Sequence, residues 1–211
     1  LGRDSEFQAI MPVRGKILNC LKADYDKIFK SDVIVDLLKV LGCGVEINSK
    51  HNKNLSTFDM KNLRWDKVVI CTDADVDGFQ IRTLILAMLY RLVPTIINEG
   101  KVFIAESPLF EITAKKKTYF AYSEKEKSDI IKKIGDEKYT VQRSKGLGEN
   151  EPEMMWETTM NPETRRLIKI NAEDVAKTSQ VFDLLLGDEL SARKEYIAEN
   201  GHLYLDMLDL S

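Results

Sequence analysis

The sequence has few of the residues that build disulfide-rich or zinc-binding proteins. Its 211 residues include only three cysteines and two histidines. No two cysteines form a Cys-X-X-Cys pair, and neither histidine has a metal-binding neighbour at a useful spacing. We therefore expect neither a zinc site nor a disulfide framework. The cysteines, Cys20, Cys43 and Cys71, are expected to be reduced thiols of a cytoplasmic protein.

The sequence also lacks an excess of positive charge and a long apolar run. The formal net charge is −3, which argues against a simple electrostatic nucleic-acid binder but permits local basic patches. The most apolar stretch, residues 81–98, contains Arg82, Arg91 and Pro94, so it does not predict a membrane span. With 44% hydrophobic and 31% charged residues, the composition is typical of a soluble globular protein of one large or two small domains.

The stretch Lys67–Arg82 (KVVICTDADVDGFQIR) carries the strongest functional signal. Its apolar residues 68–71 predict a buried parallel strand, and a long apolar helix pattern follows the stretch. Three carboxylates stand between these two elements at alternate positions: Asp73, Asp75 and Asp77. They therefore lie at the carboxyl end of a strand, where open α/β sheets bind their ligands. Carboxylates this close repel one another unless a cation, a basic partner or water offsets their charge.

Three interpretations of these acids compete. The pattern Asp-X-Asp-X-Asp-Gly also opens a calcium-binding EF-hand loop. That loop needs a bidentate Glu at its twelfth position, where this chain has Leu84, and a helix before it, which is not predicted here. The second interpretation is a solvated turn in which Asp residues cap a helix N-terminus. The third is a magnesium site with few protein ligands and several waters, which serves phosphate chemistry.

Apolar periodicity predicts most of the helices. We expect helices over residues 24–41, 81–98 and 124–134, and two further helices that start at Asn171 and Asp188. Ser31 or Asp32 and Ser123 are suitable N-caps, Gly42 and Gly135 are suitable ends, and Asn161-Pro162 predicts the start of a short helix. The whole tail from residue 149 onward is expected to be helical.

Strands are predicted from β-branched and alternating segments. We expect strands over residues 67–71, 101–105, 119–122 and 138–143, with residues 109–113 continuing the second of these after Pro108. The segment 67–105 therefore predicts a β-α-β unit, and the chain as a whole an α/β fold. A Gly between two cations, Arg14-Gly15-Lys16, suits close approach to phosphate oxygens but also fits an ordinary polar turn.

Six segments taken together resemble the B subunit of bacterial type IIA DNA topoisomerases, which is shared by DNA gyrase and topoisomerase IV. They follow one another in family order and cover most of the chain: Gln8–Asn19 (QAIMPVRGKILN), Leu41–Val45 (LGCGV), Thr72–Thr83 (TDADVDGFQIRT), Gly100–Phe110 (GKVFIAESPLF), Lys145–Glu149 (KGLGE) and Met155–Arg166 (MWETTMNPETRR). The resemblance implies a Toprim domain over residues 1–148, with a Rossmann-like, mainly parallel sheet flanked by helices. It also implies a small helical carboxyl-terminal region over residues 149–211.

The resemblance also implies roles for individual residues. Asp73 and Asp75 match the Toprim aspartates that bind Mg²⁺ and act in catalysis through the metal, and Asp77 matches the third, less direct acid. Lys16 and Asn19 match DNA-contacting positions. Arg14 falls where the family has a basic residue near its inhibitor pocket, and it is also expected to bind DNA. Lys145–Glu149 matches a motif that packs near the acids, and Lys145 is expected to contact DNA.

The sequence departs from the family pattern at two places. The family's Glu-Gly-Asp-Ser motif, which supplies another metal-binding glutamate and the first strand of the domain, would precede Gly2. We therefore expect the chain to be cut from a longer protein and, by itself, to be inactive, because two carboxylates hold Mg²⁺ weakly. After the third aspartate the family has Gly-Ser-His, whereas this chain has Gly78-Phe79-Gln80.

The implied function is the magnesium-dependent DNA cleavage and religation step of an ATP-dependent topoisomerase. The nucleophilic tyrosine would come from an A subunit, in a heterotetramer of two A and two B subunits acting on double-stranded DNA, and an absent domain would bind ATP. Two alternatives remain open. One is a non-catalytic scaffold that joins DNA and the A subunit, and the other is a different Toprim enzyme, such as a primase or a recombination nuclease.

Overall fold

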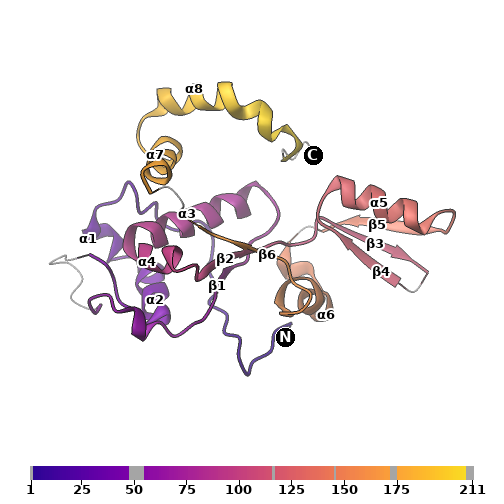
Figure 1. Ribbon diagram of the computed structural model, residues 1–211, viewed down its shortest axis with the longest axis horizontal. Coiled ribbons are helices and arrows are strands. Elements are labelled where there is room, and N and C mark those ends of the chain that lie inside the picture. Colours follow the sequence, from indigo (N-terminus) through magenta and orange to yellow (C-terminus); the bar gives the residue numbers. More distant parts are fainter. Residues whose placement is uncertain (1, 48–54, 116, 145, 172–174, 208–211) are drawn as a thin grey trace. The chain divides into compact units, whose positions relative to one another are not determined.

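Figure 1 shows the computed structural model of the protein. The structure describes residues 2–47, 55–115, 117–144, 146–171 and 175–207. The chain forms two compact units, each built from segments far apart in the sequence. The first unit comprises Leu1–Ile10, Val69–Phe79 and Phe103–Ile168, and the second comprises Met11–Val68, Gln80–Val102 and Lys169–Ser211. Within the described ranges, no helix combines the length and the hydropathy that a membrane span requires.

The second unit is mainly helical. Its helices are α1 (Tyr25–Ile28), α2 (Asp32–Leu41), most of α3 (Val76–Leu92), α4 (Pro94–Asn98), α7 (Val175–Leu186) and α8 (Leu190–Asn200), with short 3-10 segments η1 (Met60–Asn62) and η4 (Gly201–Met207). The predicted apolar stripe of α3 is largely confirmed, because Leu84, Met88, Leu89 and Leu92 are buried. Buried Ile34 and Leu38 of α2 belong to the same unit.

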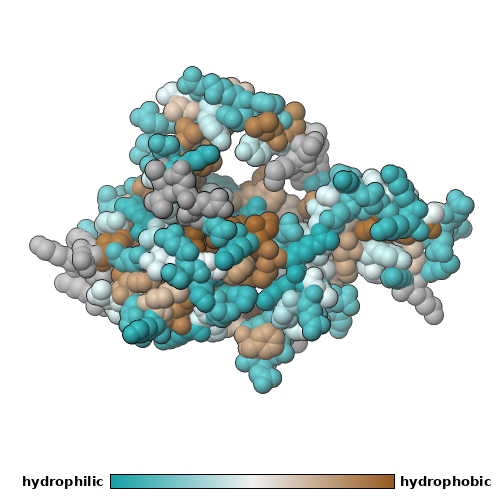
Figure 2. All heavy atoms as spheres, in the orientation of Figure 1, coloured by the Kyte–Doolittle hydropathy of each residue, from teal (hydrophilic) through white to brown (hydrophobic). Residues whose placement is uncertain are grey.

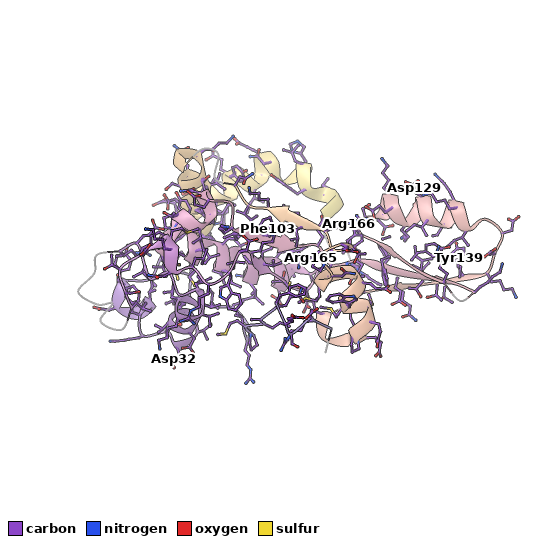
Figure 3. All side chains as sticks on the ribbon, turned by 60° about the horizontal axis from the view of Figure 1, so that its bottom comes forward. Asp32, Phe103, Asp129, Tyr139, Arg165 and Arg166 are labelled. Atoms are coloured by element: carbon purple, nitrogen blue, oxygen red, sulfur yellow. The ribbon has the colours of Figure 1, made fainter. Side chains whose placement is uncertain are left out.

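The first unit contains an antiparallel sheet with the order β4-β3-β5. Its central strand, β3 (Phe110–Ala114), pairs with β4 (Lys117–Ala121) on one side and with β5 (Tyr139–Arg143) on the other. Helix α5 (Glu124–Ile134) contacts β3 and β4, and the labelled Asp129 and Tyr139 mark α5 and β5 in Figure 3. A small apolar cluster holds them together: Phe110, Ile112 and Ala121, with Leu109, Tyr119, Ile130 and Ile134 packed against it. The outer face of α5 is charged and hydrophilic, as Figure 2 shows.

A second sheet has the order β1-β2-β6. It consists of β1 (Val68–Ile70), β2 (Val102–Ala105) and β6 (Leu167–Lys169). Strand β6 contradicts the expectation of a wholly helical tail. A segment of three residues carries too little periodicity to predict a strand, and it is stabilised by pairing with β2, where the Ile170 N–H donates to the Val102 carbonyl at 3.0 Å. The remaining short elements are η2 (Leu147–Glu149), α6 (Pro152–Met155) and a π-helical turn over Trp156–Met160.

Several predicted caps are confirmed. Ser123 caps α5, because its Oγ accepts a hydrogen bond from the Glu126 N–H at 3.1 Å. Gly42 ends α2 with φ +83°, a left-handed conformation that favours glycine. Between α1 and α2, however, the predicted helix over residues 24–41 is interrupted, and Ser31 stands at the N-cap of α2 without a side-chain cap bond.

Three other expectations were wrong. Helix α3 begins at Val76 and not at Ile81, and it ends at Leu92 because Pro94 starts a new helix. Residues 109–113 do not continue β2, since β3 pairs in the other sheet. Asn161-Pro162 starts a single turn and not a helix. The Asn161 carbonyl accepts from the Arg165 N–H at 2.9 Å, and the chain then enters β6.

Candidate metal and nucleic-acid site

The acidic loop, which joins β1 to the first turn of α3, lies in the first unit. Asp73 and Asp75 are half-buried, whereas Asp77 is exposed on the first turn of α3. Asp75 Oδ1 accepts a hydrogen bond from the Gly78 N–H at 2.7 Å, and the Asp75 carbonyl accepts from the Phe79 N–H at 2.9 Å. Asp75 therefore caps α3, which explains why the helix starts inside the acidic stretch.

Gly78 allows the backbone of the loop to approach itself closely. A Cβ at this position would lie 2.1 Å from the Asp73 carbonyl oxygen and 3.0 Å from the Asp73 nitrogen. Gly78 is buried. A side chain at this position is therefore incompatible with the observed path, and the glycine after the third aspartate is a requirement of the loop itself.

The structure brings two of the predicted motifs together. The Leu147 N–H donates to Asp73 Oδ1 at 2.8 Å, across 74 positions of sequence. Gly146 faces the same carboxylate, because a Cβ there would lie 3.7 Å from Asp73 Oδ2. Lys145, which was expected to contact DNA, lies outside the described residues, and so does the side chain of Glu149. The loop over residues 146–148 thus holds one of the two carboxylates predicted to bind metal.

The two half-buried carboxylates supply the donor chemistry that suits a magnesium ion with several waters. Their hydrogen bonds to Leu147 and Gly78 use Oδ1 of each residue, which leaves Oδ2 for a cation. Carboxylate oxygens are the ligands Mg²⁺ prefers, and it is often held by one or two of them together with phosphate oxygens. Among the described residues, no group of three or more His, Cys, Asp or Glu side chains is arranged around a common metal position. The EF-hand interpretation fails, because β1 and not a helix precedes the loop and Leu84 is buried in α3.

The predicted DNA-binding residues Arg14, Lys16 and Asn19 lie in the second unit. Arg14 and Lys16 are exposed on either side of Gly15, which has φ +74° and open space around its Cα. Asn19 is half-buried, and its amide is used inside the protein. Nδ2 donates to the Leu186 carbonyl at 3.0 Å, and Oδ1 accepts from the Leu21 N–H at 3.0 Å. Its side chain therefore anchors the chain next to the basic turn, which consists of Arg14, Gly15 and Lys16.

The sequence did not predict the residues that fix the segment following this turn, residues 20–25. Arg91 of α3 donates to the carbonyls of Cys20 and Ala23, and its guanidinium lies 4.6 Å from the Tyr25 ring centroid. Lys22 forms an ion pair of 2.8 Å with Asp188. These contacts join segments that are distant in the sequence, so no local sequence pattern predicts them. Cys20 is a fully buried free thiol, as is Cys43, and burial raises the pKa of Cys20 to about 11.

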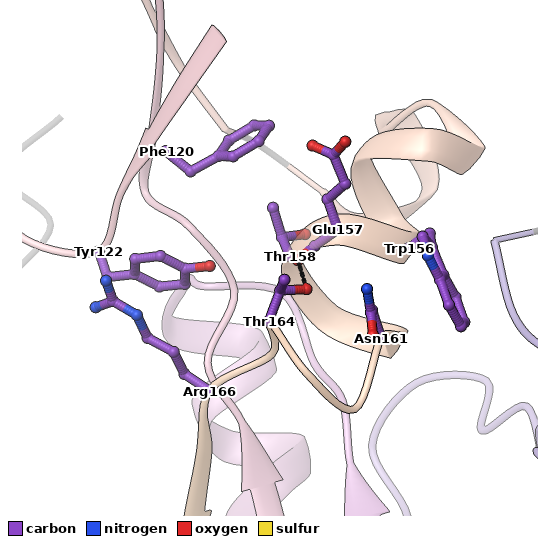
Figure 4. Close-up of a pocket in the computed structure, with 8 residues that line it drawn as sticks. All are labelled: Phe120, Tyr122, Trp156, Glu157, Thr158, Asn161, Thr164 and Arg166. Carbon is purple, nitrogen blue, oxygen red and sulfur yellow. Dashed lines mark hydrogen bonds between the residues drawn. The ribbon is translucent and has the colours of Figure 1, made fainter.

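The first unit also contains a hollow of about 500 Å³ that no predicted site residue enters (Figure 4). The following residues line it: Phe120, Tyr122, Trp156, Glu157, Thr158, Asn161, Thr164 and Arg166. Arg166 stacks over Tyr122, with 3.8 Å between the guanidinium carbon and the ring centroid, and donates to Glu126 at 2.7 Å. Thr164 Oγ1 donates to the Glu157 carbonyl at 2.5 Å. These bonds hold the turn after the π-helical segment against α5.

Comparison with known protein families assigns the chain. The family model described as the Toprim domain matches residues 1–107, about half of the chain, and the model described as the DNA gyrase B subunit, carboxyl terminus, matches residues 136–198. The chain therefore belongs to the Toprim domain family, and its α/β fold agrees with that assignment. The boundary between the two regions, expected at residue 148, stays a prediction.

Curated relatives show which member of the family the chain is similar to, namely the B subunit of DNA gyrase. That of Clostridium acetobutylicum is 46% identical over 201 residues, covering 94% of this chain and 30% of the relative. Those of Thermotoga maritima and Thermus thermophilus are 40% and 42% identical, covering 99% and 94% of this chain and 31% of each relative. The chain thus spans just under a third of each of these three relatives, and the resemblance to the B subunits of type IIA topoisomerases is confirmed.

Proposed function

We propose that the chain is the metal-holding part of a composite DNA cleavage site in a type IIA topoisomerase. The observation that carries the proposal is the pair of carboxylates, Asp73 and Asp75, at the end of β1, each fixed by one backbone N–H. An orientation fixed before a ligand arrives is what metal sites need. The similarity to the DNA gyrase B subunit supports a reaction on DNA.

The residues of this chain would divide the work between charge neutralisation and positioning. Asp73 and Asp75 would hold Mg²⁺, with Asp77 at the edge of the site. The ion would neutralise negative charge on the phosphate during strand cleavage. Arg14, Lys16 and Lys145 would bind backbone phosphates, which positions DNA without reading its sequence. Asn19 would act indirectly, because its amide keeps the basic turn in place.

Other parts of the reaction would come from outside the chain. The nucleophilic tyrosine would belong to an A subunit, so none of the seven tyrosines here is given a catalytic role. We further propose that two A and two B subunits assemble on double-stranded DNA in the cytoplasm, that ATP binds to another domain of the B subunit, and that Arg14 borders an inhibitor pocket. These statements rest on the similarity to the DNA gyrase B subunit.

The test removes the charge of Asp73 without removing its hydrogen bond. In a full-length B subunit tested with its A subunit, Asp73→Asn keeps an Oδ1 that can accept from the Leu147 N–H, but it loses the negative charge. Magnesium-dependent DNA cleavage should fall by about a hundredfold or more, as expected when a metal-binding carboxylate is neutralised. Asp129→Asn, on the exposed face of α5, is the matched control and should cleave normally. Cleavage retained by Asp73→Asn would remove this carboxylate from the mechanism.

The bond between Asp75 and Gly78 favours a second candidate, a non-catalytic scaffold whose acids only cap a helix. Asp75→Asn separates the two candidates, because asparagine caps helices as well as aspartate does but is a poorer ligand for Mg²⁺. A scaffold predicts unchanged cleavage in this variant, whereas the metal-holding role predicts a large loss.

The DNA-binding role of the basic turn is tested separately. Lys16→Ala should weaken binding to DNA of any sequence and reduce the slope of log K against log salt by about one unit, since one phosphate contact is lost. Binding is measured by fluorescence anisotropy across a salt series, with Lys125→Ala on α5 as the control. A salt dependence unchanged from the wild type would place Lys16 outside the DNA contact.

A further inference from the structure

We propose that the backbone N–H of Leu147 is a positioning group for the cation, because it fixes the orientation of the Asp73 carboxylate. This inference rests on the proposed function of Asp73 and adds a second element, the loop over residues 146–148, to the site. We do not assign any side chain of the 146–148 loop as a ligand of the ion. The loop acts through one hydrogen bond.

The geometry of the contact supports a positioning role. The Leu147 nitrogen lies 2.8 Å from Asp73 Oδ1, a length typical of a hydrogen bond strengthened by the carboxylate charge. Both residues are half-buried, so water competes less for the bond than on an open surface. Gly146 borders the same carboxylate, since a Cβ there would lie 3.7 Å from Oδ2 and 3.8 Å from Oδ1.

A hydrogen-bond donor of this kind restricts the rotation of a carboxylate before a cation binds. A free carboxylate rotates about its terminal bond, and a cation must restrict that rotation when it binds. With Oδ1 tied to the loop, the rotation is already restricted, and Oδ2 is presented in one direction. Groups in the outer shell of metal sites act in this way, and removing one typically weakens metal binding by about 10-fold to 100-fold.

The donor can be removed without changing the backbone path, because proline has no N–H. Leu147 is the first residue of η2, a position at which proline is tolerated. The preceding residue, Gly146, has φ −109° and ψ 153°, which is the extended region that a residue before proline prefers. Leu147→Pro is therefore a selective deletion of the hydrogen bond. Leu147→Ala is the matched control, since it shortens the side chain and keeps the N–H.

The first measurement is a Mg²⁺ titration of a full-length B subunit, followed by the amide NMR signals of residues 73–78. We expect Leu147→Pro to bind Mg²⁺ about tenfold more weakly than the wild type, and Leu147→Ala to bind it within about twofold. Asp73→Ala is titrated alongside. If Asp73→Ala weakens binding and Leu147→Pro does not, this inference is overturned while the proposed function stands. If Asp73→Ala binds Mg²⁺ like the wild type, both fail.

The second measurement needs no metal and no proline variant, so it holds even if Leu147→Pro does not fold. In the metal-free chain, hydrogen exchange of the Leu147 amide should be slow and should speed up by about tenfold in Asp73→Ala, because the acceptor is gone. Asp75→Ala is the control, and it should instead speed up exchange of the Gly78 amide. A Leu147 amide that exchanges equally fast in the wild type and in Asp73→Ala would overturn the inference.

Discussion

Replacing Gly78 by alanine tests the path of the acidic loop more sharply than replacing an acid does. The added Cβ would lie 2.1 Å from the Asp73 carbonyl oxygen. An ordinary contact between carbon and oxygen is about 3.3–3.6 Å, so one of the two backbone segments must move by more than about 1 Å. The bond of 2.7 Å between the Gly78 N–H and Asp75 Oδ1 lies at the same place and would break.

The expected loss of stability follows from three opposing effects. Forcing an extra carbon into a packed backbone costs about 1–3 kcal/mol, and losing the Asp75 cap costs about 1 kcal/mol. Alanine in place of glycine inside a helix contributes about 1 kcal/mol in the other direction. The net destabilisation is therefore about 1–3 kcal/mol, which corresponds to a drop of several degrees in the thermal midpoint of a chain of this size.

The assay is thermal unfolding followed by circular dichroism, with Gly201→Ala as the control. Gly201 has φ −58° and ψ −31°, and a Cβ there would meet only Ile197 Cγ2 at an ordinary 3.8 Å. Gly201→Ala should therefore unfold at the same temperature as the wild type or slightly above it. If Gly78→Ala does so too, the close approach between Gly78 and Asp73 is wrong, and the described geometry of the acidic loop fails with it.

Three further predictions concern other parts of the chain. Asn19→Ala should destabilise the chain by about 1–2 kcal/mol in urea unfolding, because the bonds to Leu186 and Leu21 are lost; an unchanged midpoint would refute the anchoring role. The pKa of Glu126 lies below its ordinary 4.5, mainly because Arg166 donates a hydrogen bond to its carboxylate. The Glu126–Arg166 pair therefore stabilises the fold fully above about pH 4.5, and this contribution is lost as the pH falls through the lowered pKa of Glu126. Glu126→Gln should therefore flatten the acid side of the profile of thermal midpoint against pH, and an identical profile would contradict this. Cys20 should resist a disulfide reagent at about pH 8 until the chain is unfolded, and rapid labelling would contradict its burial.

Local patterns predicted the elements that carry the acidic site. The apolar run before Asp73 forms β1, and the periodic residues after it are buried in α3. The caps at Ser123 and Gly42 were also predictable, because hydroxyl acceptors and left-handed glycines act on their immediate neighbours in sequence. In these places, local preference and tertiary packing favour the same conformation.

Long-range contacts decided the features that the sequence did not predict. Strand β6 exists because it pairs with β2, and that pairing turns the segment after Asn161 away from the predicted helix. The amide of Asn19 bonds to a carbonyl of α7, although a motif alone suggested a DNA contact. The hydrogen bond from Leu147 to Asp73 is donated by a backbone N–H, which almost every residue type has, so the sequence could not indicate it. The resemblance predicted that the two motifs approach each other, but not which atoms meet.

The proposal that the acidic loop holds a divalent cation is tested by locating that cation. Mn²⁺ binds oxygen ligands as Mg²⁺ does and broadens the NMR signals of nuclei near it. A Mn²⁺ titration of the chain should broaden the amide signals of residues 73–78 and 146–148 first, and excess Mg²⁺ should restore them. Broadening that starts elsewhere on the chain, or that Mg²⁺ does not reverse, would contradict the claim.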